Sequence, residues 1–103
     1  MPAVRITVRC QSSADPTTFE VSVREAASET RHHVTISQRD HERLANGRTA
    51  EQVVEAAFRF LLDREPKESI LSRFDIMVIA RYFPEFEREL PRYLAQPKDT
   101  RDA

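Results

Sequence analysis

The chain has 103 residues, a length typical of one domain, and its 40% hydrophobic and 32% charged residues exclude both an integral membrane protein and a disordered chain. Sixteen basic and seventeen acidic residues leave a net charge of −1, so no overall field would concentrate the molecule on phosphates or anionic lipids. Any contact with nucleic acid would have to come from a local patch.

The sequence contains no long apolar run, no signal segment and no second cysteine, and each absence excludes a class of protein. The longest uninterrupted apolar run, Ile76 to Ala80, is far shorter than the ~20 residues that a membrane-spanning helix needs. Met1 is followed by no signal segment, so we expect a soluble, cytoplasmic protein without membrane association. Cys10 is the only cysteine, which excludes an internal disulfide and multi-cysteine zinc motifs. Its place on the apolar side of a strand pattern predicts a buried thiol.

Three segments in the first third of the chain alternate between apolar and polar residues, which is the pattern of half-buried β-strands. They span residues 3–10, 18–25 and 31–37 and are joined by short links. Such consecutive strands favour an antiparallel meander with one packed and one solvated face. The residues predicted to face the core are Val4, Ile6, Val8, Cys10, Phe19, Val21, Val23, Val34 and Ile36.

From Ser37 onward the apolar residues follow the period of α-helices. Ser37 with Asp40, and Thr49 with Gln52, have the spacing of capping boxes, so each pair would begin a helix. Asn46 and Gly47, the latter the only glycine, would end the first of these helices. The predicted helices span residues 38–45, 50–64, 67–74, 76–83 and 84–94.

The helix at 50–64 has the strongest apolar stripe and should form the centre of the core. The helix at 76–83 is apolar nearly all round and is expected to be enclosed, whereas Pro91 should interrupt the last helix. These patterns predict an α+β domain at residues 1–96, a three-stranded antiparallel β-meander packed on four to five α-helices. A flexible tail is expected at 97–103.

Metal binding and catalysis find little support in the sequence. His32 and His33 would point to opposite faces of one strand, so they cannot hold the same ion, and His41 would lie on a helix. One glycine leaves no glycine-rich phosphate loop. The paired carboxylates of DREPKE and PEFERE alternate with Arg and Lys, as on a solvated helix face. We therefore expect no metal, no cofactor and no enzymatic activity.

The outer face of the predicted sheet carries a cluster of basic residues. One interpretation is an ordinary solvated face, whose charge neighbouring acids on loops, such as Glu25 and Glu29, would offset. The other is a surface that binds anions or nucleic acid, with binding that weakens as salt rises. Only Glu20 would oppose the basic side chains on this face. The candidate site residues are Arg5, Arg9, Arg24, Arg31 and His33.

Residues 31–65, RHHVTISQRDHERLANGRTAEQVVEAAFRFLLDRE, resemble the ribbon-helix-helix family of DNA-binding repressors and antitoxins. That family pairs one strand from each of two protomers and lays this ribbon in the major groove. The resemblance implies base contacts by Arg31, His33 and Thr35, and a phosphate held by the backbone amides near Thr49.

Residues 56–87, AAFRFLLDREPKESILSRFDIMVIARYFPEFE, resemble a stretch found in a family of small bacterial proteins without an assigned function. This resemblance implies a small bacterial cytoplasmic protein and no particular active site.

The hypothesis that follows is a non-enzymatic interaction or regulatory module with an unknown protein partner or self-association. The alternative is a ribbon-helix-helix-type DNA-binding regulator or antitoxin that uses the strand 31–37. Aromatic residues that crowd the C-terminal segment favour binding, although such residues are more often core than interface. They are Tyr82, Phe83, Phe86 and Tyr93.

Overall fold

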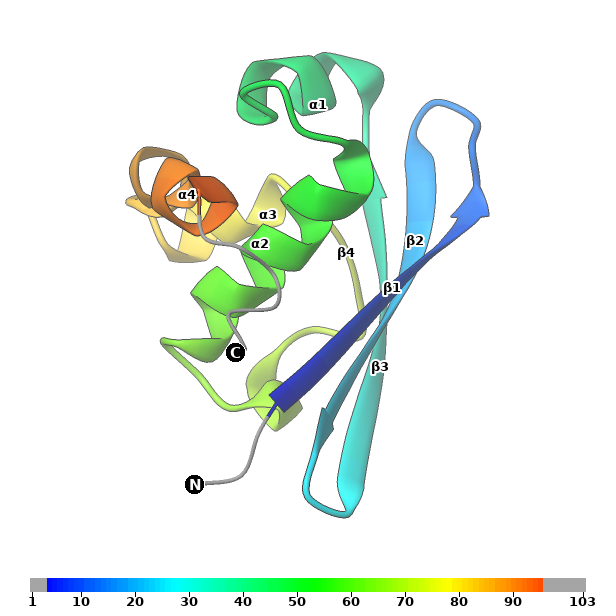
Figure 1. Cartoon of the computed structure of the whole chain (residues 1–103), viewed down its shortest axis with the longest axis vertical. Helices are drawn as coiled ribbons and strands as arrows, with labels where there is room; N and C mark the ends of the chain where they lie inside the picture. The colour runs from blue at the N-terminus through cyan, green and yellow to red at the C-terminus, as the bar shows by residue number, and fades with distance from the viewer. Residues whose placement is uncertain (1–3, 96–103) are drawn as a thin grey trace.

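The computed structural model describes residues 4–95 and shows an α+β fold in which helices cover one face of a four-stranded sheet (Figure 1). The strands lie in the order β1-β2-β3-β4. Residue 3 of the first predicted strand and the predicted tail at 97–103 lie outside the described residues. The elements are β1 (Val4–Ser12), β2 (Thr17–Glu25), β3 (Ser28–Ile36), α1 (Gln38–Leu44), α2 (Ala50–Leu62), the 3-10 turn η1 (Lys67–Ser69), β4 (Arg73–Asp75), α3 (Val78–Tyr82) and α4 (Phe86–Ala95).

The predicted antiparallel meander is confirmed for β1, β2 and β3. Val21 of β2 pairs with Val8 of β1, and Phe19 of β2 pairs with Val34 of β3, so the apolar positions of neighbouring strands share one face. Strand β3 begins at Ser28 rather than at residue 31, because Glu25 pairs with Ser28 across a two-residue turn. Ala26 in this turn has a φ of 56°, a conformation that a residue with a Cβ atom adopts uncommonly.

The fourth strand corrects the sequence prediction of a helix at 67–74. Only η1 is helical there, and the chain then extends and pairs with β3 in parallel, which makes the sheet mixed. Beyond the strand pairing itself, backbone hydrogen bonds flank β4 at both ends, from the His33 amide to the Ser72 carbonyl (2.8 Å) and from the Ile76 amide to the Thr35 carbonyl (2.9 Å). Tertiary pairing therefore overrides a local pattern that suits a helix.

A buried lysine holds η1 against the turn between β2 and β3. Lys67 is 3% exposed, and its ammonium group donates to the Ser28 hydroxyl and to the Glu68 carboxylate. A buried charge needs such partners. This contact across 39 residues of sequence is a second reason why the segment does not continue as a helix.

Both predicted capping boxes lie at the starts of helices. The Ser37 hydroxyl accepts the Asp40 amide at the start of α1, and Thr49 and Gln52 form the reciprocal pair of a full capping box on α2. Gly47 follows α1 with a φ of 88°, as expected for a glycine beyond a helix end.

The two C-terminal helices differ from their predictions. Helix α3 has only five residues and is not enclosed, since Tyr82 is 67% exposed. Pro91 lies inside α4 instead of interrupting it. It occupies an exposed position, so the Glu87 carbonyl that loses its helical partner can bond to water, while Leu90 and Leu94 anchor the buried side of the helix.

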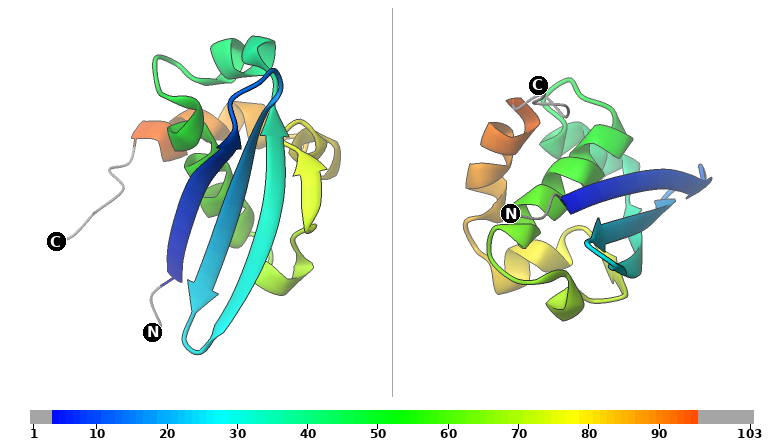
Figure 2. Two further views of the ribbon diagram at one scale, coloured as in Figure 1. Left: turned by 90° about the vertical axis from the view of Figure 1, so that its right-hand side faces the viewer. Right: turned by 60° about the horizontal axis from the view of Figure 1, so that its bottom comes forward.

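The core lies between the sheet and the helices, with α2 at its centre between the sheet and α4 (Figure 1). Phe60 joins α2 to α4 through edge-to-face ring contacts with Phe86 and Tyr93, at centroid distances of 5.1 and 5.8 Å. The opposite face of the sheet carries no helix among the described residues (Figure 2). The fully buried large side chains include Phe58, Phe60, Phe86, Ile36, Ile76 and Leu90.

The prediction that Cys10 is buried is wrong, because its thiol is exposed. Strand β1 forms the edge of the sheet, and the twist carries its C-terminal half away from α2 (Figure 1). Consequently Cys10 is exposed, although Ile6 and Val8 on the same face are half-buried. Val4, at the opposite end of the strand, is exposed as well. An alternating pattern predicts a face and does not predict how far the covering helix reaches.

Candidate functional site

The strand register places the predicted basic residues on the bare face of the sheet. Arg5 pairs directly with Arg24, and Arg9 pairs with Glu20. Arg31 pairs with Ser22 on the neighbouring strand. The side chains line a hollow of about 290 Å³ over β1, β2 and β3. The sequence pattern therefore located four of its five candidate residues in one hollow.

His33 lies on the same face at a different place. It pairs with Glu20 on β2 and with Arg73 on β4, and it is half-buried. It does not line the hollow. Because β4 was not predicted, the sequence pattern could not place Arg73 beside it.

Two glutamates neutralise part of the basic cluster. Glu20 forms a hydrogen-bonded ion pair with Arg9 (2.8 Å) and lies 3.9 Å from Arg31. Glu29 lies 3.8 Å from Arg24 and 3.5 Å from Arg31. Glu29 was expected to act from a loop, but it belongs to β3 and faces the hollow. Four arginines against these two glutamates still leave the hollow positively charged.

His32 points to the opposite face and is 2% exposed. Its Nδ1 lies 2.7 Å from the Leu71 carbonyl oxygen, and its Nε2 lies 2.9 Å from the Thr30 hydroxyl. A carbonyl can only accept, so Nδ1 carries the proton and Nε2 accepts from Thr30. Burial lowers the pKa of the His32 imidazole below its ordinary value of 6.5, because the charged form loses hydration.

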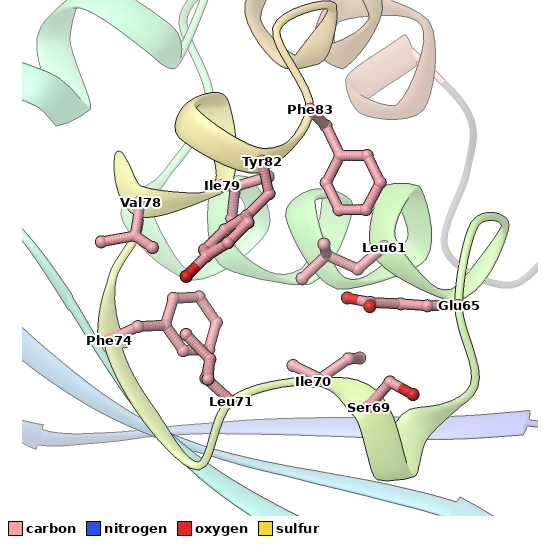
Figure 3. Close-up of a pocket in the computed structure, with 10 residues that line it drawn as sticks. All are labelled: Leu61, Glu65, Ser69, Ile70, Leu71, Phe74, Val78, Ile79, Tyr82 and Phe83. Carbon is pink, nitrogen blue, oxygen red and sulfur yellow. The ribbon is translucent and has the colours of Figure 1, made fainter.

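A second surface, which we call the apolar groove, lies between the end of α2, the segment from η1 to β4, and α3 (Figure 3). Its volume is about 350 Å³. Leu71 and Tyr82 are 48% and 67% exposed, and both line it. Its other apolar walls include Leu61, Ile70, Phe74, Val78, Ile79 and Phe83.

One carboxylate projects into this groove. The side chain of Glu65 extends between Leu61 and Ile70 (Figure 3). Partial burial raises the pKa of the Glu65 carboxyl, since the charged form is less well hydrated there. No hydrogen bond or ion pair joins this carboxylate to another residue within 4–95. The groove therefore combines apolar walls with one unpaired acid.

Sequence reasoning missed the groove because it forms only when β4 pairs with β3. The only signal was the aromatic cluster in the C-terminal segment, which divides into two pairs. Phe86 and Tyr93 are buried in the core, whereas Tyr82 and Phe83 line the groove. Spacing alone could not separate the two pairs, since all four lie on or beside short helices.

Searches of protein-family models, of characterised proteins and of solved structures found no match to this chain. Both resemblances noted in the sequence therefore stay predictions. Within the described part of the chain, no three His, Cys, Asp or Glu side chains gather as a metal site would require, and no helix is long and apolar enough to cross a membrane.

The surroundings of β3 bear on the ribbon-helix-helix alternative. Strand β3 pairs with β2 over its whole length and with β4 at residues 33–35. A ribbon between two protomers needs an edge that is free to pair with its mate. In this sheet the edge strands are β1 and the three-residue β4, so β3 could form such a ribbon only after β4 detached.

Proposed function

We propose that this protein is a non-enzymatic interaction module whose apolar groove binds a short segment of a partner protein. The segment would bring apolar side chains to Leu71 and Tyr82 and a Lys or Arg side chain to Glu65. The observation that carries the proposal is the unpaired, half-buried Glu65 carboxylate within an apolar groove.

The distribution of exposed apolar side chains supports this location. Among the described residues, the large apolar side chains that are exposed are Val4, Leu71 and Tyr82, and two of these three border the groove. Covering them would gain roughly 25 cal/mol for each Å² of apolar surface removed from water. Tyrosine is also enriched among the residues that dominate binding energy at interfaces.

Two features favour a protein segment over a small molecule. Leu71 and Tyr82 are largely exposed at the groove, and a segment of several residues is long enough to cover both. The charge of Glu65 favours a basic residue within that segment, because a cation would restore the interaction that the carboxylate loses through burial.

A random peptide library displayed on phage and selected on the full chain tests the proposal. Enriched peptides should combine large apolar residues with Lys or Arg. Their dissociation constants, measured by fluorescence polarisation, should rise at least ~10-fold with Leu71→Ser or Tyr82→Ser. The matched control is Val4→Ser on β1, which removes an exposed apolar side chain outside the groove and should change affinity less than about twofold.

Three results would contradict this function. One is the absence of any enriched peptide, and another is equal binding by the Leu71→Ser and Val4→Ser variants. The third concerns a second copy of the chain as the occupant of the groove. If sedimentation equilibrium shows a dimer that Leu71→Ser converts to monomer, the groove is occupied by a second copy of the chain and not by a segment of a partner protein.

A further inference from the structure

We infer that the basic hollow on the bare face of the sheet is a binding site for phosphate groups, independent of the apolar groove. Its floor is formed by Thr7 and Ser22, which pair directly across β1 and β2. The arginines at 5, 9, 24 and 31 form its walls, so short hydroxyl side chains are surrounded by long cationic ones.

The hydrogen-bonding capacity of the hollow is largely unused. Only Arg9 donates a hydrogen bond to a carboxylate there, at 2.8 Å from Glu20. The ion pairs of Arg24 and Arg31 are 3.5 Å or longer, and Arg5 has no acidic partner among the described residues. The Thr7 and Ser22 hydroxyls make no hydrogen bond to another residue in the described range. Guanidinium and hydroxyl donors are therefore available to an oxyanion.

The register of β1 and β2 supplies a second, independent argument. Arg5 lies directly opposite Arg24, and like charges in this position destabilise a sheet. The nearest acid, Glu29, reaches Arg24 at 3.8 Å and forms no ion pair with Arg5. An anion bound between the two guanidinium groups would remove this repulsion. Arginine is also suited to binding phosphate, because its planar guanidinium group can donate hydrogen bonds to two phosphate oxygens at once.

Phosphate groups fit better than carboxylates for a geometric reason. Donors approach the hollow from the floor and from three strands, which suits a tetrahedral group that offers several acceptor oxygens. A carboxylate has two oxygens in one plane. Glu20 and Glu29 already provide carboxylates that form ion pairs with Arg9 and Arg31 at the side of the hollow. The overall charge of −1 means that attraction depends on this local cluster.

Isothermal titration of the full chain with inorganic phosphate and with pyrophosphate, in HEPES at constant ionic strength, tests the inference. Pyrophosphate should bind more tightly than phosphate. Arg5→Gln/Arg24→Gln should weaken binding at least ~5-fold. The matched control is Arg39→Gln/Arg48→Gln, which removes the same charge from exposed arginines without ion pairs in the described structure and should leave affinity within about twofold. Thr7→Val/Ser22→Ala should weaken binding without changing the net charge.

Circular dichroism should show that the Arg5→Gln/Arg24→Gln variant folds, since the change removes a repulsive pair. A short single-stranded DNA tests whether the phosphate groups that bind here can also be those of a nucleic acid backbone. If pyrophosphate displaces it, the DNA uses the same site, which supports the inference. Three results would overturn it: no heat of binding with either phosphate, equal weakening in the two arginine variants, or DNA binding that pyrophosphate does not displace.

Discussion

The imidazole of His32 donates its Nδ1 proton to the carbonyl oxygen of Leu71, 2.7 Å away and 39 residues along the chain. Leu71 lies two residues before β4, and its side chain lines the apolar groove. The same imidazole packs against Phe58 at a centroid distance of 5.3 Å, and Phe58 packs against Phe74 of the groove at 6.0 Å. A buried histidine thus positions one wall of the proposed binding site from beneath.

The stability of the protein should fall on mild acidification because of His32. Desolvation is the largest cause of its lowered pKa; the hydrogen bond to Leu71 opposes this effect, and the charge of His33 adds to it. An unfolded histidine binds a proton near pH 6.5, whereas the folded one does so only at lower pH. Stability is therefore fully present above about pH 6.5 and is lost as pH falls through the folded pKa. Urea denaturation between pH 7.5 and 5 measures this loss.

Two variants assign that pH dependence to one residue. His32→Asn keeps a donor near the Leu71 carbonyl but cannot titrate, so the acid-linked part of the loss should disappear. His33→Asn removes a titratable group from the neighbouring, half-buried position and should retain most of the loss. The assignment fails if His32→Asn has the same pH profile as the original chain.

The fold could be predicted where sequence periodicity and burial agree. Phe19, Val21 and Val23 alternate along β2, which is covered along its length, and all three are buried. The same alternation misplaced Cys10, because β1 is an edge strand that extends beyond α2. Local spacing contains no information on the reach of a covering helix.

The candidate sites differ in predictability for a similar reason. The basic hollow follows from the alternation of residues along the strands, and the hairpins fix the strand register. Its four arginines could therefore be located from the sequence. The groove depends on contacts between residues about 40 positions apart, such as Thr35 with Asp75. The local sequence at 67–74 has helical spacing and does not encode those contacts.

Replacing Phe58 by Ala should cost about 3–5 kcal/mol of unfolding free energy. The ring is fully buried at the centre of α2 and contacts His32 and Phe74, so its loss leaves a cavity between helix and sheet. Phe58→Leu retains most of the volume and should cost less than about 1.5 kcal/mol. Chemical denaturation measures both, and a loss below about 1 kcal/mol for Phe58→Ala would place the core elsewhere.

The Asp75 carboxylate should hold the end of β4 and the start of the turn into α3. It accepts from the Thr35 hydroxyl at 2.7 Å and from the Met77 amide at 3.1 Å. Asp75→Ala should cost about 1.5–3 kcal/mol, the usual range for hydrogen bonds to a charged group. Hydrogen exchange should accelerate at the Ile76 and Met77 amides and stay unchanged between β1 and β2. Uniform acceleration throughout the sheet would contradict this local role.

Removing the charge of Glu65 should affect stability and binding in opposite directions. Glu65→Gln removes a half-buried carboxylate whose pKa is raised by desolvation, so the free protein should become more stable at pH 7. The same change should weaken the basic, apolar peptides selected on the groove. Glu51→Gln, on the exposed first turn of α2, is the control and should leave peptide affinity unchanged. Tighter binding by Glu65→Gln would show that the groove does not select a cation.

The like-charged pair between β1 and β2 predicts a stabilising substitution. Arg5→Glu would face Arg24 across the strands with the opposite charge and should raise the unfolding free energy by about 0.2–1 kcal/mol. Salt screens exposed pairs, so the gain should shrink between low and high sodium chloride. Arg48→Glu makes the same charge change at an exposed position between α1 and α2 and separates this pairing from the effect of net charge. If both variants gain equally, repulsion between Arg5 and Arg24 is absent in solution, and the stability argument for an anion between them fails with it.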